Sequence, residues 1–248
     1  MIKLENFEVV GWDHAIRGMR NPMNSWEKMD SHWCEQNAID FSVCRQCECY
    51  KEDEHCCWPT KFTIGPNDHA LMMKLRNAGT DHRKFMRMIQ VYVDVTAPLY
   101  WWKEFDTYKV GTVANSCSTM HKIHAFNFYR DDFSCEKLFP MSLKVLDATI
   151  AELNHWRTIF INGGPVYMQN GGIGGIVDLP ARDKRAWEQM IQLLPTSYNQ
   201  KRTVMMNYEN LANMYKSRKN HKLDEWHTFC DWIEGLPYSE LIIGGTDV

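Results

Sequence analysis

The stretch QVYVDVTAPLYWWKEFDTYKVGTVANSCSTMH, residues 90–121, decides how this chain folds. Apolar and polar side chains alternate through residues 90–95, which is the pattern of a strand with one buried face. The Ala97-Pro98 pair ends this pattern, because a proline restricts the backbone of the residue before it. Residues 99–109 are rich in aromatic side chains and predict a helix, and the polar residues 115–121 follow. This succession predicts a domain of mixed α and β structure.

Apolar residues recur at helical spacing on both sides of this stretch. Upstream, Pro66 begins a predicted helix, Gly79 stands at the usual position just past a helix end, and residues 81–88 predict a second short helix. Downstream, the spacing predicts helices over residues 143–160, 187–194, 204–215 and 226–233, and a terminal strand at residues 241–243. We therefore expect a single α+β domain over residues 1–248 with a helical C-terminal half.

Two segments lack this regularity. Residues 11–30 carry turn formers such as Asn21-Pro22. The glycine-rich residues 163–175 include Gly172-Ile173-Gly174, but Val177 stands where a dinucleotide-binding fingerprint needs its third glycine. We interpret this segment as a mobile loop that could act as a lid.

Composition narrows the class of protein. The net charge of −3 gives no sign of a surface for nucleic acid, so nucleic acid is not an expected partner. No run approaches the roughly 18 apolar residues of a membrane span, and the N-terminus lacks the apolar stretch of a signal peptide. These patterns predict a soluble, cytoplasmic protein that does not enter a membrane.

Cysteine is concentrated in one place. Six of the nine cysteines lie between Cys34 and Cys57, in a polar segment that we interpret as an insertion at about residues 34–57. Thiolate and imidazole groups at short spacing can bind zinc in a tetrahedral site. A structural zinc would use Cys44, Cys47, Cys56 and Cys57, although Cys34 or His55 could replace one of the last two. The alternative is a set of reduced surface thiols.

Residues 90–121 resemble the R-H-R-x-x-S-x-N-E-x-S-x-R motif of flavin-dependent thymidylate synthases, which follows a strand ending near Ala-Pro. Asn115 matches the asparagine of that motif, and Ser118 matches its second serine. Thr107-Tyr108-Lys109 fall at the R-H-R positions and Thr112 at the first serine, with one inserted residue between Thr112 and Asn115. Further matches downstream are Leu194-Pro195, Asn207 opening a helix, Leu211, Ser217-Arg218 and residues 223–226.

The motif departs from the family at its charged positions. Lys109 is its one basic residue, while Ser116 replaces the glutamate and Met120 replaces the final arginine. Arginine grips phosphate with two parallel hydrogen bonds, and losing one such contact would weaken binding by about 1.5–3 kcal/mol. Other basic residues could bind the phosphate in place of the missing arginines. They are Arg83, Arg87, Lys122, Arg202, Arg218 and Lys222.

The resemblance implies an enzyme that methylates dUMP, or a related pyrimidine nucleotide, using methylenetetrahydrofolate, FAD and NADPH. It also implies a homotetramer. It gives catalytic roles to Asn115 and Ser118. It implies substrate contacts from Ser118, Lys109, Arg218 and Glu104, and flavin contacts from Thr107, Tyr108, Lys109, Thr112, Asn115, Asn220 and His221.

Other interpretations stay open. Asn115 and Ser118 could form a turn or helix cap, since both residue types favour those positions. Arg218 could be an ordinary solvated helix residue. The protein could also be a nucleotide- or flavin-binding module of the same fold without the chemistry, or a zinc-knuckle nucleic-acid binder built around residues 34–57.

Overall fold

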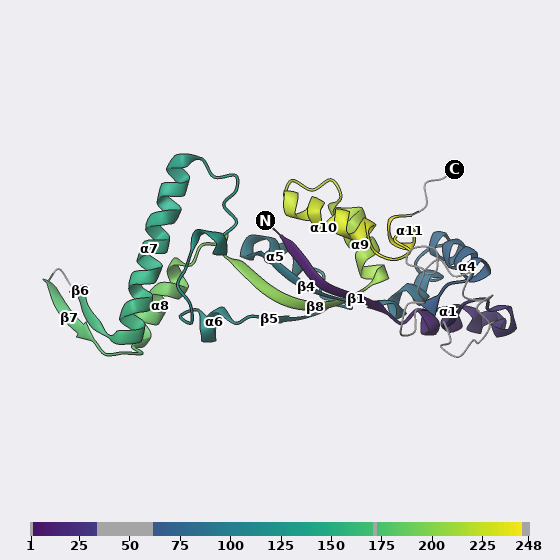
Figure 1. The fold of residues 1–248 in the computed structure, drawn as a ribbon, viewed down its shortest axis with the longest axis horizontal. Helices are drawn as coiled ribbons and strands as arrows, with labels where there is room; N and C mark the ends of the chain where they lie inside the picture. The colour runs from purple at the N-terminus through teal and green to yellow at the C-terminus, as the bar shows by residue number, and fades with distance from the viewer. Residues whose placement is uncertain (1, 34–61, 171–172, 245–248) are drawn as a thin grey trace, which may run out of the picture. The chain divides into compact units, whose positions relative to one another are not determined.

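The computed structural model describes residues 2–33, 62–170 and 173–244. Its largest sheet has four strands in the order β1 (Lys3–Val10), β4 (Gln90–Pro98), β8 (Asn199–Asn207) and β5 (Val113–Ser116) (Figure 1). The predicted strand at residues 90–95 is therefore confirmed as β4. Its alternate residues Val91, Val93 and Val95 are buried, as a strand with one face on a core requires. None of the helices among the described residues has both the length and the apolar character of a membrane span.

The chain divides into two compact units, and neither is continuous in sequence. Unit 1 consists of residues 1–6, 93–109 and 114–204, and unit 2 of residues 7–92, 110–113 and 205–248. The strands of the large sheet contribute residues to both units.

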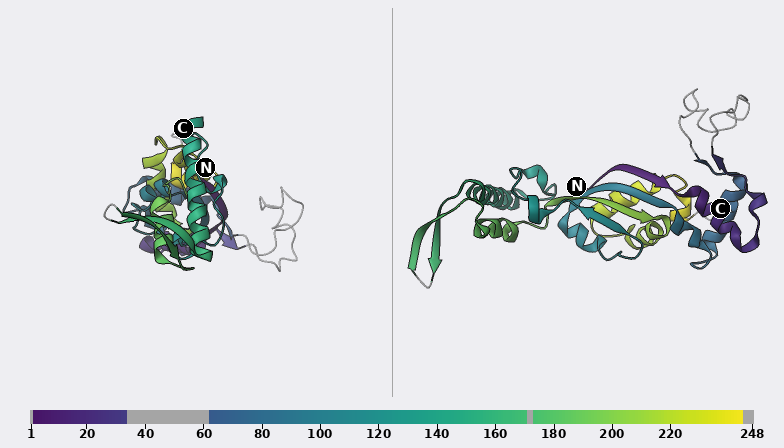
Figure 2. Two further views of the ribbon diagram at one scale, coloured as in Figure 1. Left: turned by 90° about the vertical axis from the view of Figure 1, so that its left-hand side faces the viewer. Right: turned by 90° about the horizontal axis from the view of Figure 1, so that it is seen from below.

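Unit 1 contains α5 (Leu99–Phe105), α6 (Thr119–Lys122), α7 (Pro140–Asn162) and α8 (Lys184–Leu193). Helices α7 and α8 pack against each other around Leu146, Leu153, Ala186 and Met190, and Figure 2 shows them side by side. Both follow the apolar spacing of residues 143–160 and 187–194, so the two predicted helices are confirmed.

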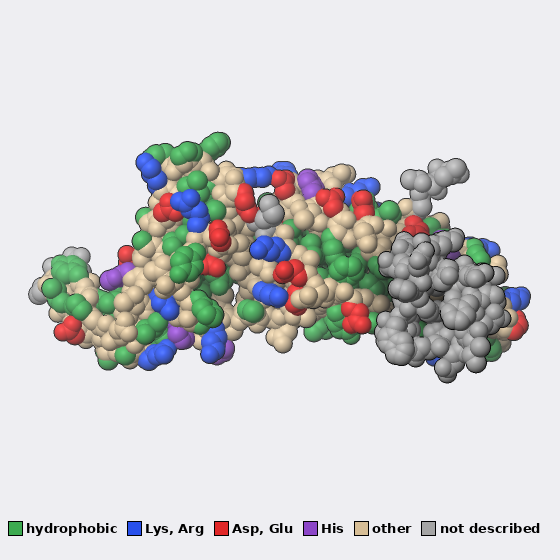
Figure 3. Space-filling view, in the orientation of Figure 1, with side chains coloured by type: hydrophobic (Ala, Val, Ile, Leu, Met, Phe, Trp, Pro, Cys, Tyr) green, Lys and Arg blue, Asp and Glu red, His purple; other side chains and the backbone are tan. Residues whose placement is uncertain are grey.

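The glycine-rich segment is a β-hairpin rather than the predicted loop. Strand β6 (Gly164–Asn170) pairs antiparallel with β7 (Ile173–Leu179), from Gly164 opposite Leu179 to Asn170 opposite Ile173. Cross-strand pairing along seven residues of each strand supplies backbone hydrogen bonds that a single-segment pattern does not reveal. Tyr167 and Ile176 are 71% and 76% exposed, and Figure 3 shows apolar side chains on this hairpin.

Unit 2 is mostly helical. It contains α1 (Trp12–Arg20), the 3-10 turns η1 (Asn21–Met23) and η2 (Trp26–Lys28), α4 (Pro66–Asn77), the 3-10 helix η3 (Arg83–Met88), α9 (Tyr208–Arg218), α10 (Asp224–Glu234) and α11 (Glu240–Ile243). A short ribbon pairs β2 (His32–Trp33) with β3 (Phe62–Thr63). The helical C-terminal half predicted for the fold is present as α7 and α8 of unit 1 and α9, α10 and α11 of unit 2.

A buried ion pair ties the first part of unit 2 together. Arg20 contacts Asp68 at 2.6 Å, and the carboxylate of Asp68 is fully buried. That carboxylate also accepts hydrogen bonds from the backbone of Asp30 and from the backbone and hydroxyl of Ser31. Burial would raise the pKa of Asp68, but these hydrogen bonds and that of Arg20 outweigh it and lower the pKa.

Three local predictions were wrong. Residues 11–30 include a full helix, α1, whose buried Trp12, Ile16 and Met19 recur at helical spacing before the expected turn at Asn21. The helix predicted over residues 204–215 begins at Tyr208, because residues up to Asn207 belong to β8. Residues 240–243 form α11 and not a strand.

Candidate functional site

The first part of the motif follows directly from the last turn of α5. Backbone hydrogen bonds run from Thr107 to Glu104, at 3.1 Å, and from Tyr108 to Phe105, at 3.0 Å. The hydroxyl of Thr107 also donates to the carbonyl of Glu104 at 2.7 Å. These bonds hold Thr107 and Tyr108 in a turn directly after the helix, with Tyr108 half-buried and Lys109 exposed.

The second part of the motif lies on β5 and at the start of α6. Asn115 is an exposed residue of β5. The backbone of Cys117 is held on both sides: its N–H donates to the carbonyl of Lys201 at 2.9 Å, and its carbonyl accepts from the Gln200 amide at 2.8 Å. Strand β8 therefore fixes the segment between Asn115 and Ser118.

Ser118 is the N-cap of α6. Its Oγ accepts the backbone N–H of His121 at 3.1 Å. The helix-cap interpretation is confirmed for Ser118, whereas Asn115 lies in a strand. A serine hydroxyl that accepts a capping bond keeps its own O–H for donation, so capping leaves one donor for a ligand.

Arg202 connects the two parts of the motif within unit 1. Its Nη1 donates to Asp106 at 2.7 Å, at the end of α5, and its Nε donates to Gln200 at 3.0 Å. Its guanidinium lies 4.2 Å from the centre of the Trp102 ring. Gln200 in turn donates to the carbonyl of Cys117, so the side chains of Arg202 and Gln200 together link both segments. These contacts commit Arg202 to a structural role, and nothing in its sequence position signalled that role.

Thr112 belongs to a short segment of unit 2 that packs against the start of α9. Asn207 caps this helix through a reciprocal pair of hydrogen bonds with Asn210, at 2.9 and 3.2 Å. Asn210 also donates to the carbonyl of Val110 at 2.8 Å. Gly111 has φ +78°, and a Cβ there would lie 2.9 Å from the side chain of Asn210. The prediction that Asn207 opens a helix is confirmed.

Arg218, Asn220 and His221 lie at the turn between α9 and α10. The guanidinium of Arg218 is 4.7 Å from the centre of the buried Trp226 ring, and the His221 ring is 6.2 Å from it. His221 also accepts the backbone N–H of Leu223 at 3.2 Å. Arg218 is thus a half-buried, stacked residue and not a fully solvated one. Asn220 is exposed.

The basic residues that could bind the phosphate in place of the missing motif arginines differ in their surroundings. Glu209, buried at the start of α9, accepts hydrogen bonds from both Arg83 and Arg87. Burial would raise the pKa of Glu209, but the two arginines lower it. Lys122 and Lys222 are exposed.

The structure thus joins Glu104, residues 107–109 and residues 115–118 in unit 1. In unit 2 it joins Thr112 to the start of α9, and Arg218 to His221. The proposed zinc ligands Cys44, Cys47, Cys56 and Cys57 lie outside the described residues. Within the described ranges, no three His, Cys, Asp or Glu side chains are grouped so that they could hold a metal ion.

Comparison with family models and with curated proteins finds no match. Solved structures do match, including two of flavin-dependent thymidylate synthase ThyX from Helicobacter pylori, both with FAD and dUMP. Each is 13% identical to this chain, with a TM-score of 0.59 over 98% of it and 97% or 98% of the other chain.

The architecture is therefore that of a mixed α+β protein. More particularly, the chain has the fold of flavin-dependent thymidylate synthase ThyX, as the motif resemblance predicted.

Proposed function

We propose that this protein is an enzyme of the flavin-dependent thymidylate synthase type, which methylates dUMP or a related pyrimidine nucleotide. The main support is the connection through Arg202 and Gln200, which holds residues 115–118 in the same unit as Lys109. The fold likeness over 98% of the chain to structures that contain FAD and dUMP supports the same proposal.

The donor chemistry of the motif segments fits FAD. The side chains of Lys109 and Asn115 are exposed and make no hydrogen bond or ion pair within the described part of the chain. Their donors are therefore available to a ligand with many acceptor atoms. We propose flavin contacts for Thr107, Tyr108, Lys109 and Asn115 in unit 1. We propose flavin contacts separately for Thr112, Asn220 and His221 in unit 2. When bound, FAD would supply the redox step of the reaction.

The chain's own residues would bind and orient the nucleotide. The Asn115 amide can both donate to and accept from a pyrimidine, and the Ser118 O–H can donate to the ring or its phosphate. Arg218, positioned by Trp226, offers a guanidinium to phosphate from unit 2. Lys109 offers a cation to the nucleotide from unit 1. Glu104 would complete the substrate contacts. Fixed donors of this kind stabilise charge that develops on the ring during methyl transfer.

Flavin absorbance of the purified protein and tritium release from C5-labelled dUMP test this proposal. We expect a yellow protein, or uptake of added FAD, and tritium release that requires methylenetetrahydrofolate and NADPH. Colourless protein that takes up no FAD would overturn the proposal.

A second candidate is a nucleotide- or flavin-binding protein of the same fold without the synthase activity. The specific support is Thr107, Ser116 and Met120, which stand where the family motif has arginine, glutamate and arginine. Flavin binding without tritium release, under conditions where dUMP also binds, would favour this candidate.

We further propose that the protein assembles as a homotetramer. The exposed apolar side chains of the β6/β7 hairpin, among them Tyr167 and Ile176, would be covered by another copy. Sedimentation equilibrium should give about four chains per particle, and a monomer at micromolar concentration would contradict it.

A further inference from the structure

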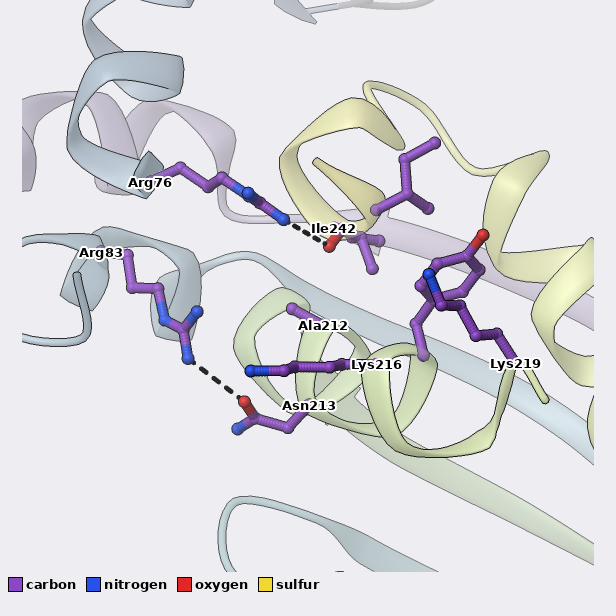
Figure 4. A pocket seen from close by; sticks show the side chains of 9 residues that line it. Arg76, Arg83, Ala212, Asn213, Lys216, Lys219 and Ile242 are labelled. Carbon is purple, nitrogen blue, oxygen red and sulfur yellow. Dashed lines mark hydrogen bonds between the residues drawn. The ribbon is translucent and has the colours of Figure 1, made fainter. Parts of the chain in front are cut away.

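Unit 2 contains a cavity of about 170 Å³ that none of the motif residues lines. It lies between α4, η3, α9 and α11 (Figure 4). Four of its lining side chains are cations: Arg76, Arg83, Lys216 and Lys219. Among the described residues that line it there is no carboxylate.

The two arginines are held in place. Arg76 donates to the carbonyls of Leu241 and Ile242, both at 3.1 Å, and to the side chain of Asn77 at 3.0 Å. Arg83 donates to Glu209 and to Asn213, both at 3.2 Å. Rigid anchoring keeps both guanidinium groups beside the cavity without a ligand.

The positive charge around the cavity is not balanced. Glu209 is the carboxylate bonded to Arg83, and it is shared with Arg87. Arg76 bonds to neutral carbonyl and amide oxygens. Burial lowers the pKa of Arg76, and the nearby charge of Arg83 lowers it further, which is the sign of like charges held close together.

The two lysines come from the C-terminal end of α9: Lys216 is in its last turn and Lys219 is its C-cap. Lys216 has neither a hydrogen bond nor an ion pair with any described residue, and Lys219 lies 5.9 Å from the centre of the Tyr215 ring. Figure 4 shows the nitrogen ends of Arg83 and Lys216 turned toward each other, and the guanidinium of Arg76 turned to Ile242. Each lysine ammonium carries three donors, so Lys216 can swing onto an anion at the place where the arginines are fixed.

We propose that this cavity binds a phosphoryl group, as a phosphate ester or diphosphate whose organic part extends out of the cavity. A tetrahedral phosphate presents several charged acceptor oxygens in different directions, which suits cations that approach from three separate elements. A planar carboxylate presents fewer acceptor oxygens, and they lie in one plane. A space of about 170 Å³ is large enough for a phosphate or diphosphate. None of the residues proposed above to contact FAD or dUMP lines this cavity, and the proposal does not require the synthase activity.

Isothermal titration calorimetry of the full chain with pyrophosphate, at low ionic strength, tests this site. The matched variants are Lys216→Ala/Lys219→Ala and Lys74→Ala/Lys144→Ala, which remove equal charge, the second pair from exposed positions outside the cavity. We expect one site per chain whose affinity falls with added salt. The first variant should bind roughly tenfold more weakly or worse, and the second within about twofold of the native chain.

Three further probes identify the ligand. Inorganic phosphate and a nucleoside diphosphate should compete with pyrophosphate. The affinity of the nucleoside diphosphate relative to that of pyrophosphate shows whether the organic part contributes. Tricarballylate, a carboxylate of similar charge, should compete at least about tenfold less well. The proposal is overturned if pyrophosphate does not bind, if both variants bind alike, or if tricarballylate competes equally. FAD absorbance, measured on the same variants, reports on the synthase site independently.

Discussion

Nη1 of Arg202 lies 2.7 Å from Oδ1 of Asp106, although 96 positions separate the two residues in the chain. The contact joins the first half of β8 to the end of α5. Because Arg202 also bonds to Gln200, and Gln200 to Cys117, the two segments of the motif share one support. The position of Ser118 therefore depends on an arginine that belongs to neither segment.

Replacing Arg202 with alanine should destabilise the protein by about 1–3 kcal/mol, since it removes two hydrogen bonds and the stacking on Trp102. Urea unfolding measures this change. The matched control is Arg130→Ala, which breaks an exposed pair with Asp147 and should cost no more than about 1 kcal/mol. Equal losses in the two variants would refute the supporting role of Arg202.

The roles of Ser118 as cap and as ligand-binding hydroxyl can be separated. Asparagine also caps helices well, so Ser118→Asn should keep the cap of α6 but lose the hydroxyl. We expect unchanged thermal unfolding and at least about tenfold slower tritium release from C5-labelled dUMP. Ser118→Thr, which keeps both features, serves as the control. Full activity in Ser118→Asn would reduce Ser118 to a structural cap.

Gly111→Ala should loosen the segment that carries Thr112. Its φ of +78° disfavours a side chain, and the added Cβ would crowd Asn210 and Asn207, at 2.9 and 3.1 Å. A loss of about 1–3 kcal/mol is expected by chemical denaturation, together with weaker FAD binding. Gly175→Ala is the control, because a Cβ there meets nothing within 4 Å. If both variants match the native chain, the close approach of Gly111 has no energetic importance.

Asp68→Ala should be the most damaging single change among those considered. It leaves the buried guanidinium of Arg20 without its partner, which typically costs about 3–5 kcal/mol. Asp147→Ala, at an exposed pair, provides the comparison. Differential scanning calorimetry should show a large drop in Tm for Asp68→Ala alone, and similar values for both variants would contradict the burial argument.

Asp94 should make stability depend on pH in the acid range. Hydrogen bonds from Thr203, Asn6 and Lys201 lower its pKa from 3.8 to about 2. Because the pKa is lower in the folded state, the stabilisation is complete above about pH 4 and disappears as the pH falls through about 2. The difference in Tm between the native chain and Asp94→Asn should shrink over that window. A constant difference between pH 2 and pH 6 would show that the carboxylate does not titrate as expected.

Much of the fold follows from patterns that are local in sequence. The alternation of residues 90–95 specified β4, and the apolar spacing of residues 143–160 and 187–194 specified α7 and α8. Asn207 opens α9, because an asparagine side chain can bond to the free N–H groups of a helix start wherever the helix lies. The buried residues of α1 also recur at helical spacing, but the turn formers that follow them led to a prediction of turns.

The tertiary structure alone decided which strands pair and which side chains meet. Strand β4 lies between β1 and β8, and sheet pairing over such separations depends on burial of the whole face rather than on any one segment. The same holds for the β6/β7 hairpin, for Arg20 with Asp68, and for Arg202 with Asp106. The sequence by itself determined β4, α7, α8 and the motif residues, because those depend on near neighbours. The hydrogen bonds that hold the motif residues in place depend on contacts between residues far apart in the sequence. So does the basic cavity of unit 2. Only folding creates such contacts.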